Sequence, residues 1–98
     1  MYNIQFTKQA EKDAVLIARA GLKQKAMELI NVVGCNPFQN PPAYEALKGD
    51  RKGAYSRRIN QQHRFVYEIL SNTENLTDAN GEPYKGIVKI IRMWTHYE

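Results

Sequence analysis

The chain opens with an alternation of polar and apolar positions that predicts a β-strand. In residues 2–6, apolar Ile4 and Phe6 alternate with an asparagine and a glutamine, which is the two-residue period of a half-buried strand. Thr7 follows, and its hydroxyl can cap the N-terminus of a helix. We therefore expect a short strand that leads directly into a helix.

Two stretches with helical periodicity come next, separated by Gly21. Each places small or aliphatic side chains three and four residues apart, the spacing of one buried helical face. Gly34 stands where a helix commonly ends in a residue at positive φ. The pattern predicts two antiparallel helices joined at Gly21. The expected buried stripes are Ala10, Ala14, Ile17 and Ala18 in residues 8–20, and Leu22, Ala26, Leu29, Ile30 and Val33 in residues 22–33.

After the helices the spacing of apolar residues changes from the three or four residues of a helix to the two residues of a strand. Residues 35–53 are rich in Asn, Pro and Gly, which predicts a loop. Three strands are then expected, separated by a short turn at residues 60–63 and by a longer one at residues 71–86, where Asn80-Gly81 favours a reversal. The expected strands are residues 54–59, 64–70 and 87–98. The order predicts one α+β domain over residues 1–98, with two antiparallel helices packed on an antiparallel sheet that the N-terminal strand forms with a C-terminal three-strand meander.

Alternation also assigns side chains to the two faces of that sheet. Arg64 lies on the same face of its strand as Val66 and Glu68, while Phe65 and Tyr67 lie on the other. On the last strand Arg92, Trp94 and His96 share a face if the pairing stays regular. One sheet face therefore gathers arginine, tryptophan and histidine, while the other packs on the helices.

Composition narrows the class of protein. The 98 residues suffice for one domain, with 43% hydrophobic and 24% charged residues as in ordinary globular proteins. A net charge of +4 suits a polyanionic or an acidic protein partner. The single cysteine, Cys35, cannot form an internal disulfide. The chain has no apolar signal core and no run of about 20 apolar residues, so we expect a cytoplasmic protein without a membrane association.

The remaining candidate chemistry is that of Glu, Arg, His and Tyr. Two histidines and one cysteine lie far apart, and no ligand spacing or phosphate-binding glycine loop is present, so neither a metal nor another cofactor is expected. Carboxylate and imidazole groups can move protons, and a guanidinium can hold a phosphate through paired donors. These groups suit metal-free RNA cleavage. From the residues alone, the sequence indicates only a basic α+β domain with a face that could bind nucleic acid.

Several motifs resemble the YoeB/Txe branch of the RelE/ParE toxin superfamily, whose members are the toxins of bacterial toxin–antitoxin modules. The similar segments cover essentially the whole chain and share that family's order of elements. They are NPF at residues 36–38, YEALKGD at 44–50, YSRRINQQHRFVYEI at 55–69 and HY at 96–97.

The resemblance implies a RelE-like fold and a ribosome-dependent endoribonuclease that cuts messenger RNA in the ribosomal A site, leaving a 2′,3′-cyclic phosphate and a 5′-hydroxyl. By position in the motifs, Glu45 matches the general base, Arg64 the phosphate-stabilising arginine, His96 the general acid and Tyr97 an aromatic residue that orients the substrate. Basic residues that match RNA-backbone contacts are Lys48, Arg57 and Arg58.

The same resemblance implies partners. One implied partner is a cognate antitoxin of the YefM/Axe type, which wraps the toxin. The ribosome and its mRNA are further partners. Operator DNA would be reached only through the antitoxin, and a homodimer is possible. Two features depart from the family pattern. The stretch 71–86 is longer than usual, which predicts a longer hairpin, and Glu98 follows the terminal His-Tyr pair.

Two other functions stay open at this point. A ParE-like toxin that acts on a topoisomerase would need neither Glu45 nor a terminal histidine as catalytic groups. A non-catalytic RNA-binding module would use the same basic face without producing cleavage products.

Overall fold

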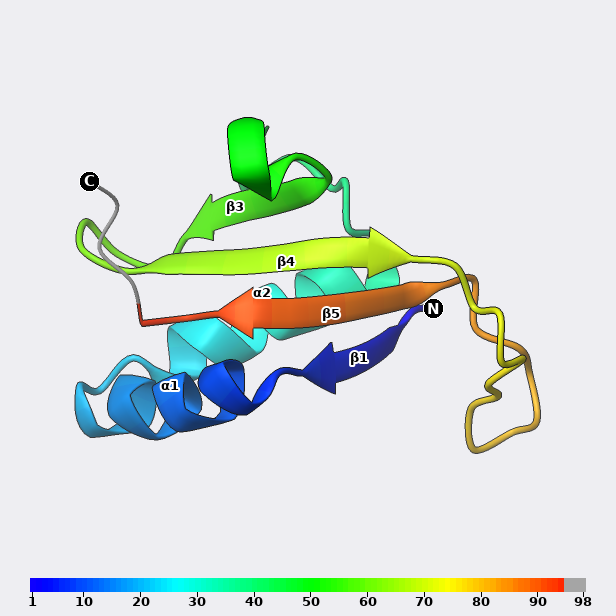
Figure 1. Ribbon diagram of the computed structural model, residues 1–98. Coiled ribbons are helices and arrows are strands. Elements are labelled where there is room, and N and C mark those ends of the chain that lie inside the picture. The colour runs from blue at the N-terminus through cyan, green and yellow to red at the C-terminus, as the bar shows by residue number, and fades with distance from the viewer. Residues whose placement is uncertain (95–98) are drawn as a thin grey trace.

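The computed structural model describes residues 1–94, in which two helices pack on one face of a five-stranded sheet (Figure 1). This architecture confirms the expected α+β, RelE-like fold. The elements in chain order are β1 (Asn3–Phe6), α1 (Lys8–Arg19), α2 (Lys23–Cys35), β2 (Tyr44–Ala46), the short 3-10 helix η1 (Gly49–Arg51), β3 (Ala54–Arg58), β4 (Arg64–Leu70) and β5 (Ile87–Arg92).

The sheet differs from the expected one in strand number and direction. Its order is β1-β5-β4-β3-β2, so β5 lies between β1 and β4 (Figure 1). Strand β1 runs parallel to β5, whereas the other neighbouring pairs are antiparallel. The expectation of an entirely antiparallel sheet was therefore wrong. Parallel neighbours need a long crossover connection, and the chain from α1 to β4 supplies it here.

Thr7 starts helix α1 as the sequence predicted. Its Oγ1 accepts a hydrogen bond from the backbone N–H of Ala10 at 3.0 Å and donates one to the carbonyl oxygen of Ile91 at 2.8 Å. The cap thus satisfies a free N–H of the first turn and ties the helix to the end of β5. The predicted buried stripe of α1 is wrong at one position, because Ala18 is exposed. The charged Asp13 is buried instead.

Gly34 does not have the role that its position suggested. Helix α2 continues through it to Cys35, and its φ is not positive. Gly34 is buried against β1, where an added Cβ would lie 3.6 Å from the side chain of Ile4, and its carbonyl oxygen accepts a hydrogen bond from the N–H of Tyr2. Gly34 is therefore a buried position inside α2 beside β1, and not a helix stop.

The core lies between the helices and the sheet face that they cover. Phe65 and Tyr67 are fully buried on the helix side, as expected, and Arg64 and Glu68 are partly exposed, but Val66 on the outer face is buried as well. No helix within residues 1–94 is long and apolar enough to span a membrane. The principal core side chains are Ala10, Ile17, Leu29, Val33, Phe65, Tyr67, Val88, Ile90 and Met93.

The long connection 71–86 is folded back on itself by side-chain hydrogen bonds. The Asn72 amide donates to the carbonyl oxygens of Leu76 and Tyr84, and Asp78 accepts from the backbone of Asn80. Gly81, at a φ of 80°, completes the expected reversal. This segment follows the C-terminal end of β4 and therefore lies at the opposite end of that strand from Arg64 (Figure 1).

Candidate functional site

Glu45 lies on strand β2 at the edge of the sheet, and not in a loop as the sequence suggested. Strand β2 pairs with β3, so that Glu45 lies opposite Ser56. The strand has only three residues and follows two prolines, so the sequence contains too short an alternation to reveal it. The ladder fixes the backbone of Glu45 while its side chain remains 61% exposed.

Arg64 lies at the start of β4 and forms an ion pair with Glu45. Its Nη1 is 3.4 Å from Oε1 of Glu45, and its side chain is 26% exposed. In the β3–β4 ladder Arg64 also lies directly opposite Arg58. Like charges at paired positions repel one another, and within residues 1–94 the carboxylate in ion-pair contact with Arg64 is that of Glu45. This arrangement favours binding of a further anion.

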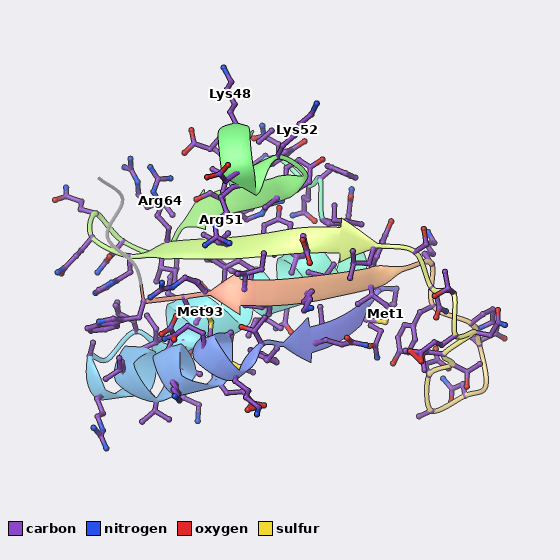
Figure 2. The ribbon with its side chains drawn as sticks, in the orientation of Figure 1. Met1, Lys48, Arg51, Lys52, Arg64 and Met93 are labelled. Atoms are coloured by element: carbon purple, nitrogen blue, oxygen red, sulfur yellow. The ribbon has the colours of Figure 1, made fainter. Side chains whose placement is uncertain are left out.

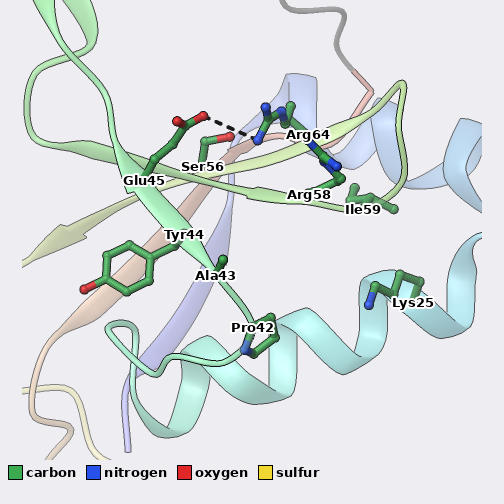
Figure 3. A pocket seen from close by; sticks show the side chains of 9 residues that line it. All are labelled: Lys25, Pro42, Ala43, Tyr44, Glu45, Ser56, Arg58, Ile59 and Arg64. Atoms are coloured by element: carbon green, nitrogen blue, oxygen red, sulfur yellow. Dashed lines mark ion pairs between the residues drawn. The ribbon is translucent and has the colours of Figure 1, made fainter.

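These three residues line an open cleft of about 550 Å³. The cleft lies between the edge of the sheet and α2, with the Glu45–Arg64 pair on one side and Lys25 on the other (Figure 3). Three cations thus line it together with a single carboxylate. Its lining residues are Lys25, Pro42, Ala43, Tyr44, Glu45, Ser56, Arg58, Ile59 and Arg64.

Lys25 and Ser56 are among the lining residues that sequence reasoning did not single out. Lys25 lies on α2 and reaches the cleft only because that helix packs beneath the sheet edge (Figure 3). Ser56 is fully buried, and its Oγ has no hydrogen-bond partner within residues 1–94. Serine within a strand gives no functional signal, so only the register opposite Glu45 identifies it.

Arg57 points to the opposite face and cannot contact RNA from its position. Its side chain is fully buried, its Nε donates to the Tyr67 hydroxyl at 3.1 Å and its Nη2 to the Pro37 carbonyl at 3.0 Å. Nη1 donates to the carbonyl oxygen of Pro42, and the guanidinium lies 4.9 Å from the centre of the Tyr44 ring. The expectation that Arg57 binds the RNA backbone was wrong because all three nitrogens are used inside the protein.

Tyr67 completes this buried polar cluster. Its hydroxyl donates to the carbonyl oxygen of Pro37 at 2.7 Å. Burial raises the pKa of this hydroxyl above the usual tyrosine value, although the hydrogen bond and positive charge of Arg57 act in the opposite direction. The cluster therefore holds the loop before β2 against β3 and β4, and so supports the strand that carries Glu45.

Lys48 is exposed but does not line the cleft. It precedes η1 and, like Lys52, points away from the sheet (Figure 2). The structure therefore places Lys48 on the outer rim of the molecule, apart from Arg58 and Arg64.

His63 is buried, whereas its position in a polar turn suggested exposure. Only 2% of His63 is exposed, and its ring stacks on Trp94 with 3.9 Å between centroids and 23° between planes. Trp94 does not continue a regular strand, because β5 ends at Arg92 and its register shifts opposite Val66 and Tyr67. The predicted catalytic residues His96 and Tyr97 lie outside the described residues.

Comparisons with known proteins agree with this fold and its motifs. The model of the YoeB-like toxin family of bacterial type II toxin–antitoxin systems matches residues 6–97. Toxin YoeB of Streptomyces coelicolor is 37% identical over 67 residues, which are 66% of this chain and 80% of that protein.

Solved structures extend the similarity over the whole fold. A YoeB/ParE toxin from Agrobacterium tumefaciens has a TM-score of 0.75 at 28% identity, covering 97% of this chain and 99% of the other. YoeB in a YoeB-YefM complex from Staphylococcus aureus has a TM-score of 0.70 at 30% identity, covering 99% of both chains. The chain belongs to the family of YoeB-like toxins of bacterial type II toxin–antitoxin systems.

Proposed function

We propose that this toxin is a metal-independent, ribosome-dependent endoribonuclease that cuts messenger RNA in the ribosomal A site. The observation that carries the proposal is the Glu45–Arg64 pair in an open cleft, with Arg58 directly opposite Arg64. A carboxylate exposed to solvent next to an excess of guanidinium charge provides a proton acceptor beside a phosphate-binding position.

In this mechanism the phosphate of the scissile bond displaces Glu45 from Arg64. Glu45 then takes the proton of the ribose 2′-hydroxyl, whose oxygen attacks the adjacent phosphorus. Arg64, aided by Arg58, stabilises the extra negative charge of the phosphorane. His96 donates a proton to the leaving 5′-oxygen, which gives a 2′,3′-cyclic phosphate and a 5′-hydroxyl, and Tyr97 orients the substrate.

Chain geometry supports the assignment of His96. Its α-carbon is two residues beyond that of Trp94, and two residues span at most about 7 Å. Trp94 stacks on His63, the residue immediately before Arg64. His96 therefore follows, by two residues along the chain, a side chain that contacts the residue before Arg64.

The ribosome is the partner that would position the substrate. The cleft is open to solvent, and the residues that line it within positions 1–94 do not enclose a base. Orientation by a partner can supply about 7–11 kcal/mol of the barrier, so we expect little cleavage of free RNA. Action on translating ribosomes also places the protein in the cytoplasm.

The decisive experiment maps messenger 5′ ends by primer extension after the purified chain meets ribosomes programmed with a defined message. A new stop within the A-site codon, absent without ribosomes, is expected. Arg64→Ala should lower the cleavage rate by about 10²–10³-fold and His96→Gln by about 10²–10⁴-fold. Arg19→Ala, which removes an exposed cation at the end of α1, is the matched control and should cleave normally.

Opposite results would identify other functions. Full activity of both Arg64→Ala and His96→Gln would contradict the mechanism. Intact messages together with a DNA-damage response would instead indicate a ParE-like action on a topoisomerase. RNA binding without cleavage, even on programmed ribosomes, would indicate a non-catalytic module.

We also infer that a YefM/Axe-type antitoxin inhibits this toxin, since the S. aureus YoeB structure contains YefM. An acidic antitoxin segment suits the net charge of +4. Contact with operator DNA would then come only through the antitoxin, and a homodimer is the other assembly to test by light scattering.

A further inference from the structure

A buried carboxylate on α1 holds the end of the described chain. Asp13 is only 1% exposed, and its Oδ2 accepts hydrogen bonds from the backbone N–H groups of Met93 at 2.9 Å and Trp94 at 3.1 Å. The Nε of Arg92 lies 3.7 Å from the same oxygen, and Gln9 donates to Oδ1 at 2.9 Å. A carboxylate removed from water needs such partners, and all of these except Gln9 come from residues about 80 positions away.

The orientation of these bonds separates Asp13 from an ordinary helix residue. Asp13 lies in the middle of α1, whose N-terminus is already capped by Thr7, so its carboxylate satisfies no end of its own helix. Both backbone donors belong instead to the segment immediately after β5. Asp13 therefore fixes a piece of irregular backbone that has no ladder partner to hold it.

A second contact fixes the same segment from the other side. The Trp94 ring stacks on the buried ring of His63. The turn before β4 that carries His63 is itself fixed, because Oδ1 of Asn60 accepts from the N–H groups of Gln62 and His63 at 2.9 Å and 2.7 Å. Trp94 is thus held between α1 and the residue that precedes Arg64.

We propose that Asp13 is a positioning residue for RNA cleavage, which acts by fixing the backbone of Met93 and Trp94, the described residues that are nearest along the chain to His96. This inference rests on the proposed function. Without Asp13, the backbone N–H groups of Met93 and Trp94 would lose this acceptor, and the stacking of Trp94 on His63 would be left to hold the segment. Small displacements of a catalytic group can cost about 10²-fold in rate, so the effect should fall on kcat and leave KM largely unchanged.

The test measures kcat and KM on programmed ribosomes for Asp13→Ala, Asp13→Asn and the control Glu11→Gln. We expect Asp13→Ala to lower kcat about 10–100-fold with KM within about twofold. Asp13→Asn keeps a carbonyl acceptor of the same shape and should recover kcat to within about threefold of the wild type. Glu11→Gln removes one exposed charge from the same helix and should leave both constants unchanged.

A second readout reports on the anchor without activity. Trp94 is the single tryptophan of the chain, so acrylamide quenching of its fluorescence measures its accessibility directly. Quenching should increase in Asp13→Ala and stay near the wild-type value in Asp13→Asn. If Asp13→Ala is unfolded by circular dichroism, Asp13→Ser, which is too short to reach both N–H groups, replaces it with the same expectations.

The outcomes distinguish this inference from the proposed function. A wild-type chain that does not cleave on ribosomes overturns the proposed function and, with it, the catalytic role of Asp13. Normal kcat of a folded Asp13→Ala variant beside an active wild type overturns the inference alone, as does unchanged Trp94 quenching. A loss shared equally by Asp13→Ala and Glu11→Gln would also overturn it, because net charge would then explain the effect.

Discussion

At the scale of single residues, Arg57 and Arg58 show how neighbours in a strand acquire unrelated roles. Arg58 lines the cleft, whereas Arg57 is enclosed by Pro37, Pro42 and Tyr67. A buried guanidinium is stable only when its donors are satisfied, and here carbonyl oxygens of the loop before β2 satisfy them. Arg57 therefore fixes the approach to the strand that carries Glu45.

We predict that Arg57→Ala lowers the free energy of unfolding by about 3 kcal/mol, because it leaves a cavity and removes the donors to the Pro42 carbonyl and the Tyr67 hydroxyl. Arg58→Ala should change it by less than about 0.5 kcal/mol, as for other exposed sites. Urea unfolding measures both. Equal stability of the two variants would show that the buried hydrogen bonds of Arg57 contribute nothing.

At the scale of elements, Gly34 and Gly86 both lie beside the N-terminal segment of the chain, but they differ in the space available for an added Cβ. Gly34 lies within α2, where an added Cβ would make an ordinary 3.6 Å contact with Ile4. At Gly86, just before β5, an added Cβ would lie 2.9 Å from the carbonyl oxygen of Leu70 and 3.1 Å from the Tyr2 ring. The backbone of β4 at Leu70 cannot move away easily, because it is paired with Ile87 of β5.

The expected result is that Gly34→Ala raises the free energy of unfolding by up to about 1 kcal/mol, since alanine is the better helix residue. Gly86→Ala should lower it by about 1–3 kcal/mol through steric strain. Thermal unfolding of the two variants beside the wild type measures these shifts. Destabilisation by Gly34→Ala would mean that the Ile4 side chain cannot accommodate an added Cβ at this position.

At the scale of the whole molecule, positive charge is collected from distant parts of the chain. Lys25 from α2, Arg58 from β3 and Arg64 from β4 meet at one cleft (Figure 3). Each phosphate contact releases counterions, so binding to single-stranded RNA should weaken with salt in proportion to the number of contacts.

Binding of a non-cleavable 2′-O-methyl RNA oligonucleotide tests whether these cations contact phosphates. The slope of log K against log[salt], measured by fluorescence anisotropy, should fall in magnitude by about 0.7 in Arg58→Ala, which corresponds to one phosphate contact. Arg19→Ala, far along α1, should leave the slope unchanged. An identical slope in Arg58→Ala and the wild type would show that Arg58 makes no phosphate contact.

The sequence by itself determined the helices, the longer strands and the faces of β4, because each depends on a local period of side chains. It also identified Glu45 and Arg64 through motifs that resemble the family. It could not identify the short edge strand β2, whose three residues contain less than two periods of alternation. The parallel pairing of β1 with β5 was equally hidden, because pairing between distant segments leaves no local pattern.

Only the tertiary structure decided which polar residues face the cleft. Strand register placed Glu45 beside Arg64, helix packing brought Lys25 to the same cleft, and burial removed Arg57 from it. Asp13 likewise became an anchor only once α1 lay against the end of β5. Local sequence sets the conformation of each element, whereas the surroundings of a charged side chain depend on elements that are far away in the chain and close in space.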